Sequence, residues 1–148
     1  MFTLKKTLVL GAVFAVGLTA AQAADDPIAT RKALMKTVGV SIKASVPMIR
    51  GKVPYDAVKA ELAMRAINAV ATGIGNFYPD GSQTGGKTSA SPKIWSDRAG
   101  YTALRKEMAD ASAAAMVAAK AGEGPFKAAF GKVGATCKKC HKAYRVKK

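Results

Sequence analysis

The chain has 148 residues, and 24 lysines and arginines outnumber 9 aspartates and glutamates to give a formal net charge of +15. Its length matches one domain. It holds a single histidine and two cysteines, which excludes chemistry that needs paired histidines. No paired-carboxylate motif accompanies them, so we expect no enzyme activity.

The N-terminus has the three parts of a secretory signal peptide. The charged segment MFTLKK precedes the apolar run TLVLGAVFAVGL, and Ala21 and Ala23 occupy the positions that a cleavage site requires. The run is too short to span a membrane, so an uncleaved anchor is the weaker alternative. We expect a signal peptide over 1–23, a domain over 24–148 and a periplasmic location. In that compartment the positive charge favours acidic proteins or anionic membrane surfaces over nucleic acid as partners.

Glycine and proline divide the remainder into four helical segments. The first begins after Asp26, a suitable N-cap, with Pro27 at its first position. Its apolar residues recur at spacings of three and four, and Pro47 is expected to kink its end. The second begins near Pro54, and its predicted apolar face consists of Val58, Leu62, Ala66 and Ala69.

The third predicted helix runs from about Pro92 to Ala121, and the fourth begins at Pro125. The third carries the stripe Trp95, Tyr101, Leu104, Met108, Ala111, Ala115 and Ala119. The fourth carries Phe126, Phe130, Val133, Cys137, Cys140, His141 and Tyr144. No segment alternates as a strand does. The pattern predicts an all-α protein, an antiparallel four-helix bundle.

The segment GSQTGGKT, residues 81–88, matches the phosphate-binding pattern G-x-x-x-x-G-K-[ST]. That pattern binds a nucleotide only between a strand and a helix. Here a helix precedes it, and Pro92 would interrupt a helix that began on it. We therefore interpret the segment as the linker between the second and third helices, and we expect no nucleotide binding.

The C-terminal segment CKKCH is the attachment motif for a c-type haem. On a helix, Cys137, Cys140 and His141 share one face, so two thiols can form thioethers while the imidazole reaches the iron. Three alternatives fit the motif less well. A zinc site usually needs four cysteine or histidine ligands, and this chain has three. A thioredoxin-like redox pair needs a strand–helix context that the sequence does not predict, and a disulfide within one helix would constrain the chain little. The motif predicts one covalently attached haem c, with His141 as the proximal iron ligand.

No methionine or histidine follows His141. If the protein also supplies the sixth ligand of the iron, that residue must therefore precede His141 in the sequence. The candidates are Met35, Met48, Met64, Met108 and Met116.

The chain resembles the class II c-type cytochromes, the cytochrome c′ family. The resemblance rests on RKALM in the first helix, on the glycine-rich linker ending in PKIW, and on CKKCHKAYR at the C-terminus. It implies a four-helix bundle that holds the haem inside, with the first helix crossing the distal face. It places Met35 above the iron and favours the low-spin, methionine-ligated branch. Two alternatives stay open: Met35 lies beside the iron without binding it, or it only fills the core.

Four further residues are expected in the haem pocket. Arg31 precedes Met35 by one turn and can pair with a haem propionate, a role the resemblance also implies; the alternative is a solvated charge. Arg145 would flank His141 and, as the resemblance implies, tune the reduction potential of the iron. Trp95 and Tyr144 are interpreted as haem-packing aromatics rather than redox relays.

The leading functional hypothesis is a periplasmic single-electron carrier with His141 and Met35 as axial ligands. The alternative is a five-coordinate protein that binds NO or CO. The basic run Lys138, Lys139, Lys142, Arg145, Lys147 and Lys148 indicates either a solvated face or a docking surface for an acidic redox partner. Dimerisation through the first two helices is common in the family and is a further expectation.

Overall fold

The structure is a computed structural model, and it describes residues 26–146. The predicted signal peptide, residues 1–23, lies outside this part of the chain. The described residues form the helices α1 (Pro27–Ile49), α2 (Ala57–Gly73), α3 (Lys93–Ser96), α4 (Arg98–Ala121) and α5 (Glu123–Tyr144), and the 3-10 helix η1 (Ile74–Phe77). None of the helices in residues 26–146 is long and apolar enough to cross a membrane.

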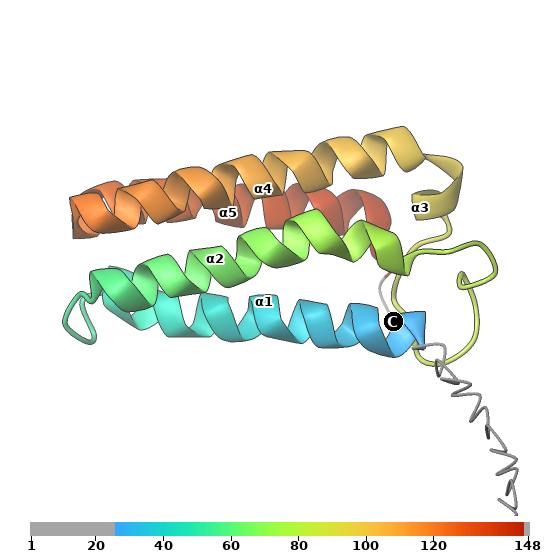
Figure 1. Cartoon of the computed structure of the whole chain (residues 1–148), viewed down its shortest axis with the longest axis horizontal. Coiled ribbons are helices and arrows are strands. Elements are labelled where there is room, and N and C mark those ends of the chain that lie inside the picture. The colour runs from blue at the N-terminus through green and yellow to red at the C-terminus, as the bar shows by residue number, and fades with distance from the viewer. Residues whose placement is uncertain (1–25, 147–148) are drawn as a thin grey trace, which may run out of the picture.

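The four long helices α1, α2, α4 and α5 lie side by side, and each runs antiparallel to its neighbours (Figure 1). This arrangement confirms the predicted all-α four-helix bundle. Contacts are extensive between α1 and α2, between α2 and α4, and between α4 and α5, whereas α1 and α5 touch only sparsely. The bundle is therefore open on its α1–α5 side.

Aspartate side chains fix the starts of the first two helices. Asp26 Oδ1 accepts a 2.8 Å hydrogen bond from the Ile28 amide, and Pro27 occupies the first turn as predicted. Asp56 Oδ1 accepts from the Lys59 amide at 3.0 Å. Because this cap satisfies an amide that has no partner within the helix, α2 begins after Asp56 rather than near Pro54.

The single helix predicted from Pro92 to Ala121 is interrupted at Asp97. The backbone of this residue is not helical, with φ −132° and ψ 60°, and its Oδ1 accepts from the Gly100 amide at 3.0 Å. An aspartate that caps the following turn cannot also continue the preceding helix, so α3 ends and α4 starts anew. The last helix begins two residues before the predicted Pro125, which the first turn accommodates.

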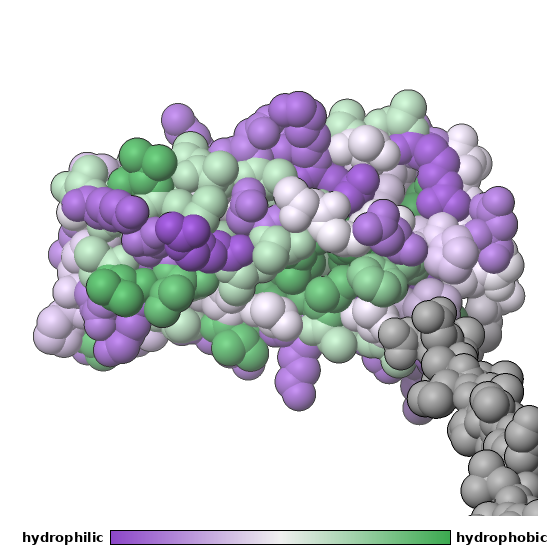
Figure 2. Space-filling model, in the orientation of Figure 1, coloured by the Kyte–Doolittle hydropathy of each residue, from purple (hydrophilic) through white to green (hydrophobic). Residues whose placement is uncertain are grey.

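The predicted apolar face of α2 is wrong. Val58 and Leu62 are 66% and 59% exposed, and the face that enters the core holds Ala60, Ala63, Met64, Ile67, Val70 and Ala71. Met64 and Ile67 are fully buried and offer more apolar area than the predicted stripe, so burial of this face is favoured. Figure 2 shows hydrophobic patches, separated by hydrophilic side chains, on the face of the molecule that it presents.

The linker between α2 and α4 contains the segment 81–88. Gly81, Gly85 and Gly86 have φ values of +83°, +89° and +57°, which favour glycine. No strand leads into this segment and no helix starts on it within the described chain, as expected for a linker. Its end pairs with the chain after α5: the Ser91 amide donates to the Tyr144 carbonyl at 2.9 Å, and the Val146 amide to the Ser89 carbonyl at 3.0 Å.

Candidate haem site

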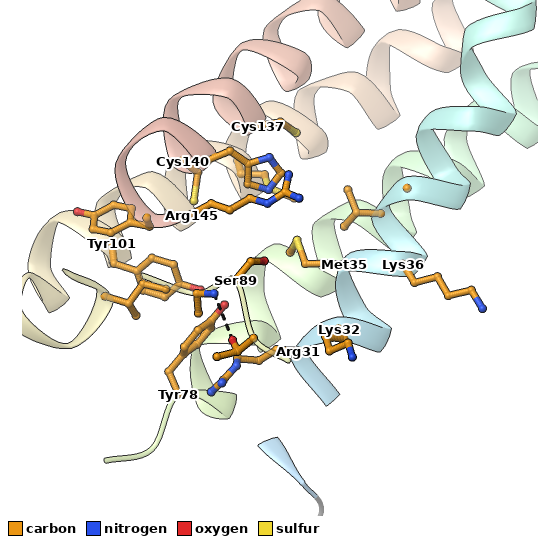
Figure 3. Close-up of a pocket in the computed structure, with 18 of the residues that line it drawn as sticks. Arg31, Lys32, Met35, Lys36, Tyr78, Ser89, Tyr101, Cys137, Cys140 and Arg145 are labelled. Carbon is orange, nitrogen blue, oxygen red and sulfur yellow. Dashed lines mark hydrogen bonds between the residues drawn. The ribbon is translucent and has the colours of Figure 1, made fainter. Parts of the chain in front are cut away.

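A cavity of about 750 Å³ lies at the open α1–α5 side of the bundle. One wall comes from α1 and the opposite wall from α5, while the linker and α4 supply the remainder (Figure 3). The volume lies within the range of cofactor pockets, about 300–1,000 Å³. Apolar side chains dominate its lining.

The three residues of the attachment motif line this cavity together. Cys137 and Cys140 are half-buried free thiols, and burial raises the pKa of both. His141 is exposed at one edge, yet partial desolvation lowers its pKa, and the Arg145 guanidinium lowers it further. A neutral imidazole is the form that binds iron, so the surroundings of His141 suit a metal ligand.

These residues fit a covalently attached haem. Two thiols and one imidazole face one apolar cavity, as the i, i+3, i+4 spacing predicts. Among residues 26–146 no cluster of three or more histidine, cysteine or acidic side chains is arranged to hold a metal ion directly. Cys137, Cys140 and His141 are the residues that would hold the haem.

The α1 wall lies across the cavity from the attachment motif. It includes Met35, Val38, Gly39 and Ile42. Met35 is 37% exposed, and Figure 3 shows it on the opposite side of the cavity from Cys140 and Arg145.

The structure narrows the set of methionines that could reach the iron. Met48 and Met64 are buried in the core, at 2% and 0% exposure. Met108 lines the cavity from α4, the helix packed beside α5, whereas Met35 lines it from α1. Met35 therefore lies on the wall across the cavity from His141, and ligation of the iron by Met35 stays a prediction.

Arg31 lines the cavity but is not a solvated charge, because only 4% of it is exposed. Its Nη1 donates to the Phe77 carbonyl at 2.8 Å and to Ser82 Oγ at 2.9 Å, and its Nη2 donates to the Ser82 carbonyl at 2.9 Å. The guanidinium also lies 4.6 Å from the centre of the Tyr78 ring. Arg31 thus fastens the linker to α1. Its buried Nε has no partner among residues 26–146, and pairing with a haem propionate stays a prediction.

Tyr144 and Arg145 line the cavity, but Trp95 does not. The Trp95 indole donates to the Pro79 carbonyl at 3.0 Å and packs edge-on against Tyr78, with ring centres 5.5 Å apart. Trp95 thus supports the cavity wall from behind Tyr78. Tyr144 is buried, and its hydroxyl donates to Asp97 Oδ2 at 2.7 Å, which raises its pKa to about 12.

Several residues of the cavity were not anticipated as pocket residues. Tyr101 belongs to the apolar stripe predicted for the third helix, and that periodicity could have identified it. Met108, from the same stripe, was already among the candidate iron ligands. Tyr78 lies in a segment without periodicity, and it meets the cavity because Arg31 and Trp95 hold it there. Lysines of α1 also line the cavity: Lys32, Lys36 and Lys43.

The bundle and this site define a class of protein, the four-helix haem proteins with a C-terminal attachment motif. The family model described as Cytochrome C′ matches residues 26–145. The cytochrome c′ of Rhodopseudomonas palustris is 36% identical over 99% of this chain and 95% of its own length. Its solved structure superposes with a TM-score of 0.78, covering 83% of this chain and 98% of that one.

Two further relatives bear on the site. A cytochrome c-556 of Agrobacterium tumefaciens is 30% identical, over 80% of this chain and 95% of its own length. A variant of cytochrome c′ from Alcaligenes xylosoxidans, solved as its nitric oxide complex, is 30% identical with a TM-score of 0.75, over 83% of this chain and 95% of that one. The chain belongs to the cytochrome c′ family. It carries one covalently attached haem c, as the motif at Cys137, Cys140 and His141 predicted.

Proposed function

We propose that the protein binds a diatomic gas, nitric oxide or carbon monoxide, at the distal side of its haem. The observation that carries this proposal is the relationship to a cytochrome c′ solved as a nitric oxide complex. When bound in the cavity, the haem supplies an iron that changes between the ferric and ferrous states and accepts a ligand on each face. This was the alternative hypothesis from the sequence, and the comparisons support it better than the leading one.

The α1 wall suits a small apolar ligand. Val38 and Ile42 present aliphatic side chains to the cavity, and Gly39 adds no side chain. Met35 is not packed into the core, so its thioether can turn away from the iron without opening a void in the bundle. His141 would hold the iron from the α5 side, beside Arg145.

A second candidate function is single-electron transfer with His141 and Met35 as axial ligands. The position of Met35 opposite His141 favours it, as does the similarity to a protein named cytochrome c-556. Two protein ligands that stay bound when the iron changes oxidation state keep the reorganisation energy of electron transfer small. The identity of the two ligands also tunes the reduction potential of the iron.

The visible spectrum of the reduced holoprotein, with and without CO, separates the two candidates. A high-spin spectrum that shifts when CO is added supports gas binding. Sharp low-spin bands that CO leaves unchanged support the electron carrier. In that second case Met35→Leu should convert the protein to the CO-binding form. The matched variant Met108→Leu, on the other side of the cavity, should keep the low-spin bands.

Neither candidate requires turnover, so we propose that the protein is not an enzyme. The single histidine would be held by iron, which leaves no imidazole for acid–base catalysis. The N-terminal pattern supports export to the periplasm. Signal-peptide cleavage after Ala23 is checked by N-terminal sequencing of the protein recovered from a periplasmic extract.

We further propose that two copies associate through α1 and α2. The support is a set of exposed apolar side chains on these two helices, Val40, Val58 and Leu62, at 59%, 66% and 59% exposure. A shallow groove is lined by Val40 from α1 and Ala66 from α2. Burying such side chains against a second copy would remove apolar area from water.

A further inference from the structure

Four cationic side chains surround the haem cavity from two sides. Lys32, Lys36 and Lys43 belong to α1, and Arg145 follows the last turn of α5. All four are exposed and line the cavity. Figure 3 shows Lys32 and Lys36 on the α1 side, with Lys36 extending outward, and Arg145 on the α5 side. We call these four residues the rim cations.

The positive charge of the rim cations is not compensated within the described chain. No aspartate or glutamate of residues 26–146 lines the cavity. The ion pairs of this part of the chain form elsewhere, for example Lys106 with Asp110 at 2.7 Å and Lys120 with Glu61 at 3.5 Å. None of the ion pairs in residues 26–146 includes a rim cation.

The C-terminal basic run is divided by the fold. Lys139 pairs with Glu107 of α4, and neither residue lines the cavity; residues 147–148 lie outside the described part. Among the described residues of that run, Arg145 alone lines the cavity, while three lysines of α1 line it from across the opening. Uncompensated charge around a concave opening focuses the electric field there and attracts an oppositely charged partner.

We propose that the mouth of the haem cavity, framed by the rim cations, is the docking surface for a protein electron donor with an acidic face. The proposal rests on the proposed function in one respect, since an electron carrier must be reduced in each cycle and carbon monoxide binds only ferrous iron. A protein partner fits better than a lipid surface. The rim surrounds an opening, whereas binding to a membrane favours a polybasic face with apolar residues that insert.

The test uses the ferric holoprotein and a reduced flavodoxin, a protein with an acidic surface, as the probe. Stopped-flow absorbance measures the second-order rate of haem reduction at several ionic strengths. The rim variant is Lys32→Glu/Lys36→Glu. The control variant is Lys52→Glu/Lys127→Glu, which changes the net charge equally at the other end of the bundle. About 20 Å of helix separates Lys36 from Ile49, the last residue of α1 before the loop that carries Lys52. Eighteen residues of mostly helical chain, about 27 Å, separate Lys127 from Arg145, well beyond a Debye length of about 10 Å.

We expect the wild-type rate to fall steeply with added salt, and the rim variant to be about tenfold slower at low ionic strength. The control variant should stay within about twofold of wild type. A neutral reduced flavin should reduce all three proteins at equal rates, which shows that the haem sites are intact. Equal slowing of both variants, or a wild-type rate that salt leaves unchanged, would overturn the proposal.

Sedimentation with phosphatidylglycerol vesicles tests whether an anionic membrane surface, rather than a protein, binds to the rim. If the rim variant loses vesicle binding but keeps the wild-type rate with flavodoxin, the rim serves a membrane surface and the proposal is wrong. Failure of docking is distinct from failure of the proposed function, because the CO spectrum of the wild-type protein involves no partner and no rim substitution.

Discussion

The Tyr144 hydroxyl donates a 2.7 Å hydrogen bond to Asp97 Oδ2, and this pair joins the end of α5 to the start of α4. Asp97 simultaneously caps α4 through the Gly100 amide. A side chain on Gly100 would lie 2.5 Å from the Tyr144 hydroxyl oxygen, so only glycine allows this approach. Tyr144 lies three residues after His141, and the bond therefore fixes the helix end that carries His141.

The stability that Asp97 contributes should depend on pH in the acid range. The hydrogen bond from Tyr144 and the bond from the Gly100 amide lower the pKa of Asp97 below its usual value of about 3.9. A carboxylate with a lowered pKa stabilises the fold above the unfolded-state pKa, and this contribution disappears as pH falls through the folded-state value. Asp97→Asn should therefore lower the melting temperature at pH 5–7, and the difference from wild type should shrink below about pH 4.

The control for this prediction is Asp110→Asn, which removes the same charge from an exposed ion pair on α4. It should lower the melting temperature little at any pH, because exposed pairs contribute little. Tyr144→Phe should reproduce the loss seen in Asp97→Asn at neutral pH. If Asp97→Asn and Asp110→Asn behave alike, the Tyr144–Asp97 bond does not hold the two helices together.

Removing Arg31 should loosen the linker. Arg31→Ala leaves the carbonyl groups of Phe77 and Ser82 without a donor, and loss of charged hydrogen bonds at a buried site costs about 3 kcal/mol in the free energy of unfolding. Urea denaturation measures that loss, and limited proteolysis should cut the linker between residues 77 and 92 faster than in wild type. Lys32→Ala, an exposed neighbour, should change neither result, and an equal cleavage rate in all three proteins would contradict the prediction.

Covalent attachment should depend on both cysteines. A gel run under denaturing conditions and stained for haem should show haem on the wild-type chain and none on Cys137→Ser/Cys140→Ser. The double variant retains the His141 imidazole and the cavity, so haem that binds it without a covalent bond is extracted by acidified organic solvent. Haem that stays on the denatured double variant would contradict attachment at these thiols.

The exposed apolar side chains of α1 and α2 should govern association. Leu62→Glu places a charge among them and should shift the protein to monomers in analytical ultracentrifugation, because a buried unpaired charge is strongly unfavourable. Val117→Glu is the matched control, since Val117 is also exposed, at 72%, but lies on α4. A wild-type protein that is already monomeric at high concentration would refute the association.

Local chemistry was enough to predict much of this protein. The spacing of Cys137, Cys140 and His141 predicts attachment and proximal ligation because residues three and four apart share a helix face in any context. The N-cap Asp26 and the apolar periodicities likewise predict four long helices, since these are interactions between near neighbours in the chain.

Other features depend on contacts between distant segments. Val58 and Leu62 have the spacing of a core face, yet neighbouring helices bury the opposite face of α2, because that face fills the bundle better. Asp97, which caps α4 locally, also accepts a hydrogen bond from Tyr144, 47 residues away, and no local pattern predicts that contact. No short-range pattern places Lys36 and Arg145 on opposite sides of one cavity. Packing of α1 against α2, which leaves α5 at a distance, creates both that cavity and its charged rim.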